Sequence, residues 1–374
     1  MAVKKLEMRS STKKKYLTLA GMLLFYVVMI ISFGSLKNAM QGWLISICFN
    51  VILAVSLNLT VGILGDLSLG HAGFMCVGAF VGAFLSKLIY VMNPEMNEIL
   101  RIVIALAAGG IMAGVFGLLI GAVVLRLSGD YLAIVTLAFG EIIWKLCQSV
   151  NVLLTENNGL KFKLGTVGFG AQEGGTVICN GAQGIYDIGK LGKRELFTVA
   201  FIMAFITVWI ILNLIHSQRG RAIKAIRDNK IAAESIGLNL KKYKLTALTI
   251  SAFFAGIGGV LFAFYNGQAV AGASDYGYTM SINILVFVVL GGMNSTLGAI
   301  IAATVLTVLP GWLRFLSTYR MLIYSIVLIV IMLFRSSPEL RAALDRVTAP
   351  VSGFFKGLFG RKKKAAAGKE NANG

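Results

Sequence analysis

Apolar runs long enough to cross a lipid bilayer recur along nearly the whole chain. A helix needs about 20 consecutive apolar residues to span the hydrocarbon core. Of the 374 residues, 57% are hydrophobic and only 14% are charged, against about 25% charged residues in a typical soluble domain. We therefore predict an all-α, polytopic membrane protein. The seven clearest runs are 16–34, 43–62, 72–92, 102–125, 131–152, 196–215 and 245–266.

The formal net charge of +19 is concentrated in three segments that flank apolar runs. Residues 1–15, 216–244 and 335–374 hold six, eight and nine Lys or Arg residues. Basic segments beside membrane spans are typical of the cytoplasmic side. No basic stripe is interleaved with aromatic residues, so the charge pattern argues against nucleic-acid binding.

The C-terminal apolar region predicts a broken helix. Residues 279–313 would measure about 52 Å as one helix, which exceeds the thickness of the hydrocarbon core. Gly291 and Gly292 offer a break, and the piece before them is short enough to be a half-helix. With one more run at 321–334, we predict about ten transmembrane helices with both termini in the cytoplasm.

The same count defines the predicted organisation of the chain. A basic cytoplasmic tail (1–15) and a second, largely disordered basic tail (336–374) flank one membrane domain at 16–335. That domain contains a Gly-rich extracytoplasmic loop (153–195) and a cytoplasmic loop (216–244) that we call the coupling loop.

Several kinds of enzyme chemistry lack their motifs in this sequence. There is no GxxxxGK[ST] phosphate loop, so ATP hydrolysis by that route is excluded. Two histidines are too few for a His-rich metal site, and we expect neither a metal nor a catalytic residue. Acids inside or beside spans are Asp66, Asp130 and Glu141, which keep an ion-coupled carrier open as an alternative.

Two short helices are predicted within the coupling loop. Asp228 or Asn229 can cap the second helix and Gly237 can end it. We interpret the element as a docking site for a soluble partner, with Ala232, Ala233 and Ile236 exposed; the alternative is a basic loop on lipid headgroups. The predicted docking residues are Arg221, Ile223, Ile226, Arg227, Ala232, Ala233, Ile236 and Gly237.

Polar residues in the stretch GDLSLGHAGF (65–74) predict a helix joint. Asp66 is expected to cap the next helix, and His71 to contact a neighbouring carbonyl or to line a pathway; proton chemistry is a third alternative. A second joint is predicted where Ser128 and Asp130 cap a helix that starts near Tyr131. The pathway or joint candidates are Asp66, Ser68, Gly70, His71, Gly73, Ser128, Asp130, Tyr131, Gly291 and Gly292.

The order Ala232-Ala233-x-x-x-Gly237 resembles the EAA loop of bacterial ABC-importer permeases, with Ile231 in place of the first Glu. The longer string GRAIKAIRDNKIAAESIGLNLKKYKL resembles the branched-chain amino acid permease family, specifically its LivM-type subunit. Five further stretches resemble the same family, and the resemblance runs from about residue 45 to 335. They are GDLSLGHAGF, SGDYLAIVTLAFGEI, NGAQGI, VLGGMNSTLGAIIAATVLTVLP and RMLIYSIVLIVIMLFR. The sequence SSPEL after Arg335 and the long insert before NGAQGI depart from the family pattern.

The resemblance implies an ATP-driven importer in a bacterial plasma membrane. This chain would pair with a LivH-like permease and contact membrane lipid. Two ABC ATPase subunits would use ATP and Mg, an extracytoplasmic binding protein would deliver the substrate, and this chain would bind no cofactor. The implied substrates are Leu, Ile and Val, with urea, amides or other amino acids as alternatives in the same class. Outside that class, an ion-coupled secondary carrier and a structural membrane protein remain alternatives.

Overall fold

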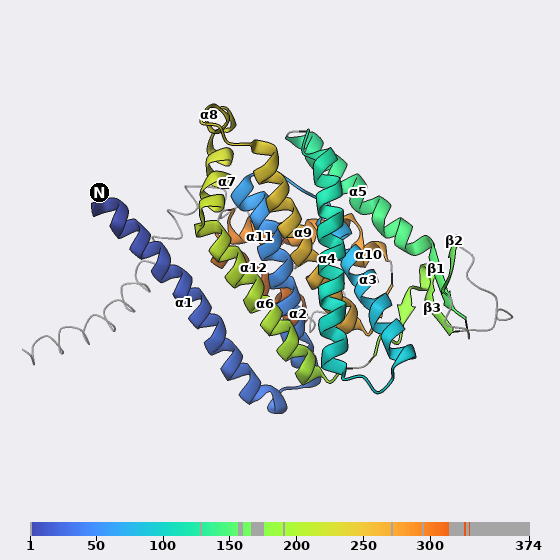
Figure 1. Cartoon of the computed structure of the whole chain (residues 1–374). Coiled ribbons are helices and arrows are strands. Elements are labelled where there is room, and N and C mark those ends of the chain that lie inside the picture. The colour runs from blue at the N-terminus through green and yellow to red at the C-terminus, as the bar shows by residue number, and fades with distance from the viewer. Residues whose placement is uncertain are drawn as a thin grey trace, which may run out of the picture. The chain divides into compact units, whose positions relative to one another are not determined.

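Seven long apolar helices dominate the part of the chain that the structure describes (Figure 1). The computed structural model describes residues 2–127, 129–155, 160–165, 176–189, 191–270, 272–293, 295–313, 325, 326 and 329. By length and composition, each of the seven helices is able to cross a membrane, and they coincide with the seven predicted runs. They are α1 (Ala2–Ser32), α2 (Asn38–Asn58), α3 (His71–Met92), α4 (Glu98–Val124), α5 (Asp130–Ser149), α6 (Lys193–His216) and α9 (Leu240–Asn266).

Two shorter apolar helices follow, and they confirm the predicted break in the C-terminal region. The helix α11 (Tyr278–Gly291) ends where Gly292 adopts a φ of +98°, and α12 (Thr296–Trp312) begins four residues later. At 1.5 Å per residue, the 14 residues of α11 extend about 21 Å, too short to cross the hydrocarbon core alone. The count of ten stays a prediction, because most of the run 321–334 lies outside the described residues.

The centre of the bundle is built from α3, α4 and α9, which touch through glycines. A Cβ at Gly78 would fall on the backbone of Gly256, and one at Gly110 would lie 3.0 Å from Ile257 Cγ1. Helices in lipid gain little from the hydrophobic effect on contact, so close backbone approach must supply the packing energy. Glycines spaced four residues apart in the sequence, such as Gly78/Gly82 and Gly110/Gly114, therefore lie at contacts between these helices.

The first helix, α1, attaches to the bundle through aromatic stacking on α6. The rings of Tyr26 and Phe201 stack at 4.6 Å, and those of Phe33 and Phe197 at 5.4 Å. Only 11% of the apolar span of α1 is buried within this chain, so most of that helix is left to contact lipid or another protein.

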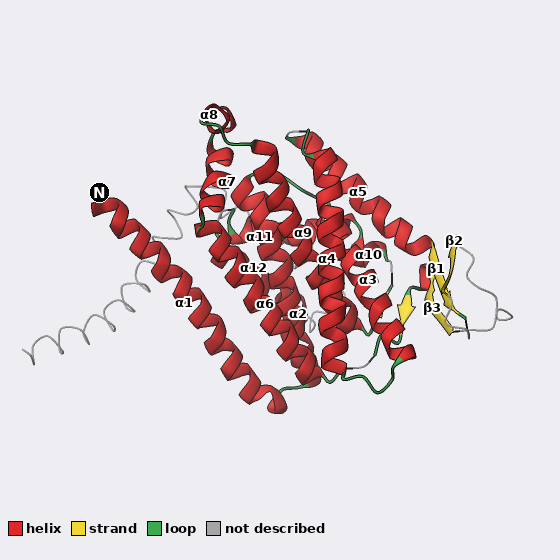
Figure 2. Cartoon of the chain, viewed as in Figure 1, coloured by secondary structure: helices red, strands yellow, loops and turns green. Residues whose placement is uncertain are grey.

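A small antiparallel sheet occupies the predicted extracytoplasmic loop (Figure 2). Its strand order is β2-β1-β3, and Val152 pairs with both Phe162 and Cys179. The sequence analysis predicted a Gly-rich loop and missed these strands. They are β1 (Val150–Leu154), β2 (Leu160–Leu164) and β3 (Thr176–Asn180).

A second strand pair joins two loops that are distant in sequence. The strand β4 (Ile185–Tyr186), before α6, pairs with β5 (Gln268–Ala269), after α9. These loops therefore lie on the same side of the bundle, as the alternation of spans requires. The helix α10 (Ala273–Tyr276) follows β5 and leads into α11.

The helices α7 (Gln218–Asp228) and α8 (Lys230–Ser235) form the coupling loop between α6 and α9. Figure 1 places them at the end of the bundle where α5 begins, whereas the β1–β3 sheet lies beyond the end of α5. Residues 1–311 form one compact unit. The basic tail 336–374 lies outside the described residues.

Candidate functional site

The chain reverses direction between α2 and α3 through an irregular segment. The last residues of α2 widen into a π-helical turn, η2 (Leu59–Leu64), which Gly65 ends with a φ of +80°. Residues 65–71 then run back toward the bundle, and we call them the joint. Within it, the Asp66 amide donates to the Thr60 carbonyl at 3.2 Å. Irregular backbone at such a place is tolerated only where protein covers it.

The coupling loop and the start of α9 supply the counter-charges for Asp66. The Asp66 carboxylate lies 2.5 Å from Lys244 Nζ and 3.6 Å from Lys230 Nζ. The side chains of Asp66 and Lys244 are only 5% and 8% exposed, whereas Lys230 is half-exposed. A buried acid is tolerated when it is paired in this way. The prediction that Asp66 caps α3 is wrong, because that helix starts at His71 after Gly70 without a side-chain cap.

A hydrogen bond from α7 reaches the π-helical turn beside the joint. Arg227 Nη1 donates to the Gly62 carbonyl at 3.2 Å. The alkyl part of the same side chain covers Gly65, where a Cβ would lie 2.6 Å from Arg227 Cγ. Both the positive φ and the close contact therefore require glycine at this position. The coupling loop thus holds the joint through Arg227 as well as through Lys230.

The other side of the joint packs against α5. The Leu69 amide donates to Thr136 Oγ1 at 3.1 Å. A Cβ at Gly70 would meet the Thr136 carbonyl, and one at Gly73 would lie 2.8 Å from Gly140 Cα. The two predicted joint glycines therefore allow α5 to approach. Ser68 is buried in the same segment.

His71 connects the joint to α2 through Ser56 and through a hydrogen bond with the Leu53 backbone, so its predicted contact with a neighbouring carbonyl is present. Its Nε2 lies 2.9 Å from Ser56 Oγ, and the Ser56 hydroxyl donates to the Leu53 carbonyl at 3.0 Å. Because that hydroxyl has a single proton, Nε2 of His71 must be the donor in this contact. The Ser56 carbonyl in turn accepts from Ser251 Oγ of α9 at 2.7 Å. His71 is buried, with 2% exposure.

The broken helix α11 also contacts the start of α3. Ser281 Oγ accepts from the Ala72 amide at 3.1 Å. This bond satisfies one of the free amides at the beginning of α3. The joint and the residues beside it thus contact α2, α5, α7, α8, α9 and α11.

Within the coupling loop, both short helices are capped; the cap of α8 was predicted from the sequence, whereas the cap of α7 was not. Asn229 Oδ1 accepts from the Ala232 amide at 3.0 Å and caps α8. Ser217 caps α7 by accepting from the Gly220 amide at 3.2 Å. Gly237 ends the element with a φ of +83° and donates to the Glu234 carbonyl at 2.9 Å.

The surface of the coupling loop differs from the predicted one. Ile231 and Ile236 are 79% and 75% exposed, and Ala232 lies exposed between them in sequence. Ala233, predicted to be exposed, is buried because α8 turns that face onto the protein. Ile223 and Ile226 share one helical face as predicted, but that face is buried and is not a free docking surface.

The coupling loop also carries basic side chains. Arg221 is exposed and donates to the His216 carbonyl at 3.3 Å. Partial burial and the nearby Arg227 charge lower the pKa of Lys224, although Asp228 acts in the opposite direction. The surface of the coupling loop therefore contains both apolar and positively charged side chains.

The second predicted joint differs in its capping. The helix α5 begins at Asp130, and the preceding Gly129, with a φ of +64°, makes no side-chain cap. Asp130 therefore does not cap the helix, but its charge still favours the positive helix end. Tyr131 is largely exposed. Ser128 lies outside the described residues.

The partners of Asp66 were the residues that sequence reasoning missed. Lys244 is the last basic residue before the apolar run of α9, and Lys230 begins α8. The sequence did contain a signal for this pairing. A buried acid needs a cation as its partner, and both lysines lie in the basic segment that flanks a span. Among the described residues, no group of three or more His, Cys, Asp or Glu side chains is arranged to hold a metal ion.

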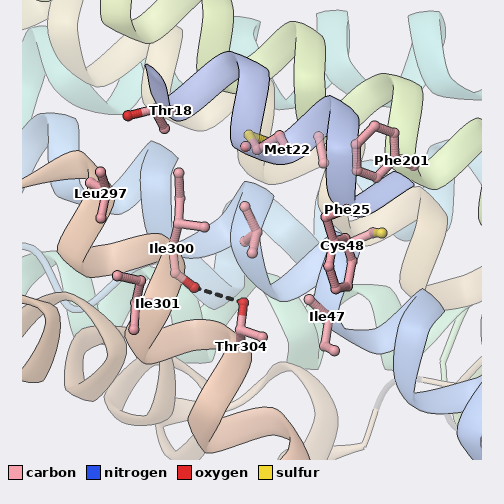
Figure 3. A pocket seen from close by; sticks show the side chains of 13 residues that line it. Thr18, Met22, Phe25, Ile47, Cys48, Phe201, Leu297, Ile300, Ile301 and Thr304 are labelled. Carbon is pink, nitrogen blue, oxygen red and sulfur yellow. Dashed lines mark hydrogen bonds between the residues drawn. The ribbon is translucent and has the colours of Figure 1, made fainter. Parts of the chain in front are cut away.

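A separate cavity of about 310 Å³ lies between α1, α2, α6 and α12 (Figure 3). Its described lining is apolar apart from a few groups such as Thr304, whose hydroxyl already donates to the Ile300 carbonyl at 2.8 Å. A zwitterionic solute would lose its hydration here without gaining matching bonds. The cavity fits an apolar chain better than a polar solute.

Comparison with known proteins places the joint and the coupling loop in a family. The family model for the branched-chain amino acid transport system / permease component matches residues 39–334. The chain belongs to this permease family. It is a multi-pass membrane protein.

Curated relatives agree with the family match. The high-affinity branched-chain amino acid transport system permease protein LivM of Escherichia coli K12 is 35% identical over 291 residues, covering 76% of this chain and 66% of that protein. LivM of Salmonella typhimurium is 33% identical over 333 residues, covering 87% and 75%. A probable branched-chain amino acid transport permease protein LivH of Methanocaldococcus jannaschii is 24% identical over 272 residues, covering 72% and 78%. No solved structure matches the chain.

The family match contains the whole joint and the whole coupling loop. It ends at residue 334, just before the tail in which the sequence departs from the family pattern. The two elements that contact each other in the structure thus both belong to the permease module.

Proposed function

We propose that this chain is the LivM-type permease subunit of an ATP-driven importer of branched-chain amino acids in a bacterial plasma membrane. It lines half of the translocation pathway, and a LivH-like permease lines the other half. Two ABC ATPase subunits bind the cytoplasmic loops of the two permeases, one of them at the coupling loop of this chain, and hydrolyse ATP with Mg. An extracytoplasmic protein delivers Leu, Ile or Val. The chain itself binds no cofactor.

One observation carries this proposal: the element that exposes Ile231 and Ile236 is attached directly to the joint inside the bundle. Two exposed isoleucines at the end of a membrane protein facing water are suited to a groove in a soluble partner. Lys230 on the same short helix reaches Asp66. A force on α8 therefore acts on the joint without passing through a flexible linker.

The contacts of the joint explain how such a force reaches the spans. When ATPase closure displaces α7 and α8, Arg227 and Lys230 move the segment that holds α2, α3 and α5 together. Coupling of two distant sites requires an element that both sites bias. In this protein the joint is that element, and its movement opens or closes the pathway lined by the spans.

Co-purification from detergent-solubilised membranes tests the docking surface. Ile231→Asp and Ile236→Asp place a charge at the contact and are expected to abolish binding of the ATPase subunits, while this chain still inserts and pairs with the second permease. Phe162→Asp is the matched control, because Phe162 is also largely exposed, at 67%, but lies in the β1–β3 sheet. Retention of the ATPase by both Ile variants would place the docking surface elsewhere.

An ion-coupled carrier is the alternative, and it would function without ATPase subunits. It would need an acid free to exchange a proton or an ion with the pathway, but the Asp66 carboxylate is already paired with Lys230 and Lys244. Uptake into proteoliposomes distinguishes the two: the importer requires ATP inside and the binding protein outside, whereas the carrier responds to an ion gradient alone.

A further inference from the structure

Two opposite charges stand one helical turn apart on α5. Glu141 lies about halfway along this span and Lys145 lies four residues further on, so both project from the same face. Charged side chains within a span face the interior, a water-filled cavity or a pathway, and they usually pair with each other. A Glu and a Lys at this spacing are well placed for an ion pair.

The two charges nevertheless do not pair in the structure. Glu141 accepts two hydrogen bonds of 2.7 Å, from Trp144 Nε1 and from the Tyr278 amide at the start of α11. Lys145 Nζ lies 4.0 Å from the centre of the Trp144 ring and 3.5 Å from Gln148 Oε1. Neither residue belongs to any of the three ion pairs among the described residues. Trp144 thus holds the two charges apart.

No described residue of this chain covers the face of α5 beside these charges. Only a third of the span is buried, and Ile134, Ala138 and Ile142 form an exposed ridge at a spacing of four residues. Ala138 has a much smaller side chain than the two isoleucines beside it. Lipid covers apolar side chains well, but it gives no partner to separated charges. The combination therefore indicates contact with a pathway rather than with lipid.

A zwitterionic amino acid has the complementary groups. Its ammonium fits a carboxylate that has two unused acceptor positions, and its carboxylate fits a lysine. Its branched side chain has room beside the small, exposed Ala138. We propose that Glu141 and Lys145, held apart by Trp144, form a transient binding site for the transported amino acid. This inference rests on the proposed function, because the second permease must close the other side of the site.

Transport by the complete importer in proteoliposomes tests the site. Glu141→Gln and Lys145→Gln are each expected to lower leucine transported per ATP by about tenfold or more, the loss expected when a charge-assisted hydrogen bond is replaced by a neutral one. Subunit assembly and ATPase activity are expected to persist. Glu95→Gln and Lys161→Gln remove the same charges at exposed positions outside the spans and should transport as the wild type does.

The design separates a binding role from a structural one. If Glu141 only holds α11, the amide oxygen of Gln still accepts from Tyr278 and transport is unchanged, which overturns the proposal. Wild-type transport in both the Glu141 and the Lys145 variants overturns it as well, while leaving the importer function intact. A wild-type complex that transports no amino acid overturns the proposed function instead.

If a variant fails to assemble, a measurement on the wild-type protein tests whether Glu141 binds the amino acid. A carbodiimide modifies accessible carboxyl groups, and peptide mass spectrometry locates the modification. We expect leucine to protect Glu141 in the purified complex, and 4-methylpentanoate, which lacks the ammonium group, to give no protection. Equal protection by both compounds, or by neither, would show that the carboxylate does not bind the ammonium.

Discussion

The Lys244 ammonium lies 2.5 Å from the Asp66 carboxylate, and both side chains are buried where α9 begins beside the joint. Because the second cation, Lys230, belongs to the coupling loop, the pair links the transmembrane bundle to the proposed ATPase contact. A buried ion pair adds little net stability, since desolvation offsets the attraction. In this protein the charges instead fix the joint, the coupling loop and the start of α9 in one arrangement.

Removing one member of this pair should be worse than removing both. Asp66→Ala leaves Lys244 buried without its partner, and we expect a loss of about 3–5 kcal/mol in the free energy of unfolding. The double variant Asp66→Ala/Lys244→Met should recover most of that loss, because apolar groups replace both charges. Thermal unfolding of the purified complex measures the difference.

Measuring leucine import by the same variants separates the effect of the ion pair on stability from its effect on the coupling between the ATPase contact and the spans. The double variant should be stable yet import leucine poorly, because the joint no longer contacts Lys230. Asp228→Asn is the control: its ion pair with Arg227 is exposed, so it should cost less than about 1 kcal/mol. Wild-type import by the double variant would show that the ion pair serves packing alone.

A glycine comparison tests the contact between Arg227 and the joint. Gly65 and Gly237 have nearly equal φ values of +80° and +83°, but only Gly65 has a neighbour where a Cβ would stand. Gly237→Ala should cost about 1–2 kcal/mol for backbone strain alone. Gly65→Ala should cost more, and Arg227→Ala in that background should recover the excess. Equal destabilisation by the two glycine variants would mean that Arg227 does not press on Gly65.

His71 should tolerate replacement by another donor. His71→Asn retains an N–H group for Ser56 Oγ and should keep most leucine uptake, whereas His71→Leu loses the bond and should cost about 1 kcal/mol of stability. Uptake and thermal unfolding, measured on the same preparations, check this result. Complete loss of uptake in a stable His71→Asn protein would instead assign His71 a direct part in the pathway.

The lengths of the apolar runs and the positions of the charges predicted the membrane helices. Both reflect one physical quantity, the free energy of transferring a segment from water into lipid. The seven long helices and the break at Gly291 follow from run length. The cap at Asn229 and the end at Gly237 follow from local backbone chemistry. Such features depend on neighbours in the sequence, so a single sequence contains them.

Features that depend on distant segments were missed or misassigned. Asp66 looked like a helix cap because its lysine partners lie more than 160 residues away. Ala233 looked exposed because its small side chain does not reveal which face packs. The β1–β3 sheet has short strands separated by long loops, so its pairing leaves little periodic signal.

The thiol of Cys179 provides a test of the extracytoplasmic sheet. Burial raises the pKa of Cys179 to about 11, and the Sγ atom lies 3.2 Å from the Val150 carbonyl, to which the thiol donates. A raised thiol pKa keeps the neutral, unreactive form to higher pH, so alkylation at pH 8 should be about 100-fold slower than for an exposed cysteine and should accelerate as pH rises toward 11. Iodoacetamide labelling followed by peptide mass spectrometry measures the rate, and labelling after denaturation provides the fast reference. Rapid labelling of the folded protein at pH 8 would mean that β3 does not bury this residue against β1.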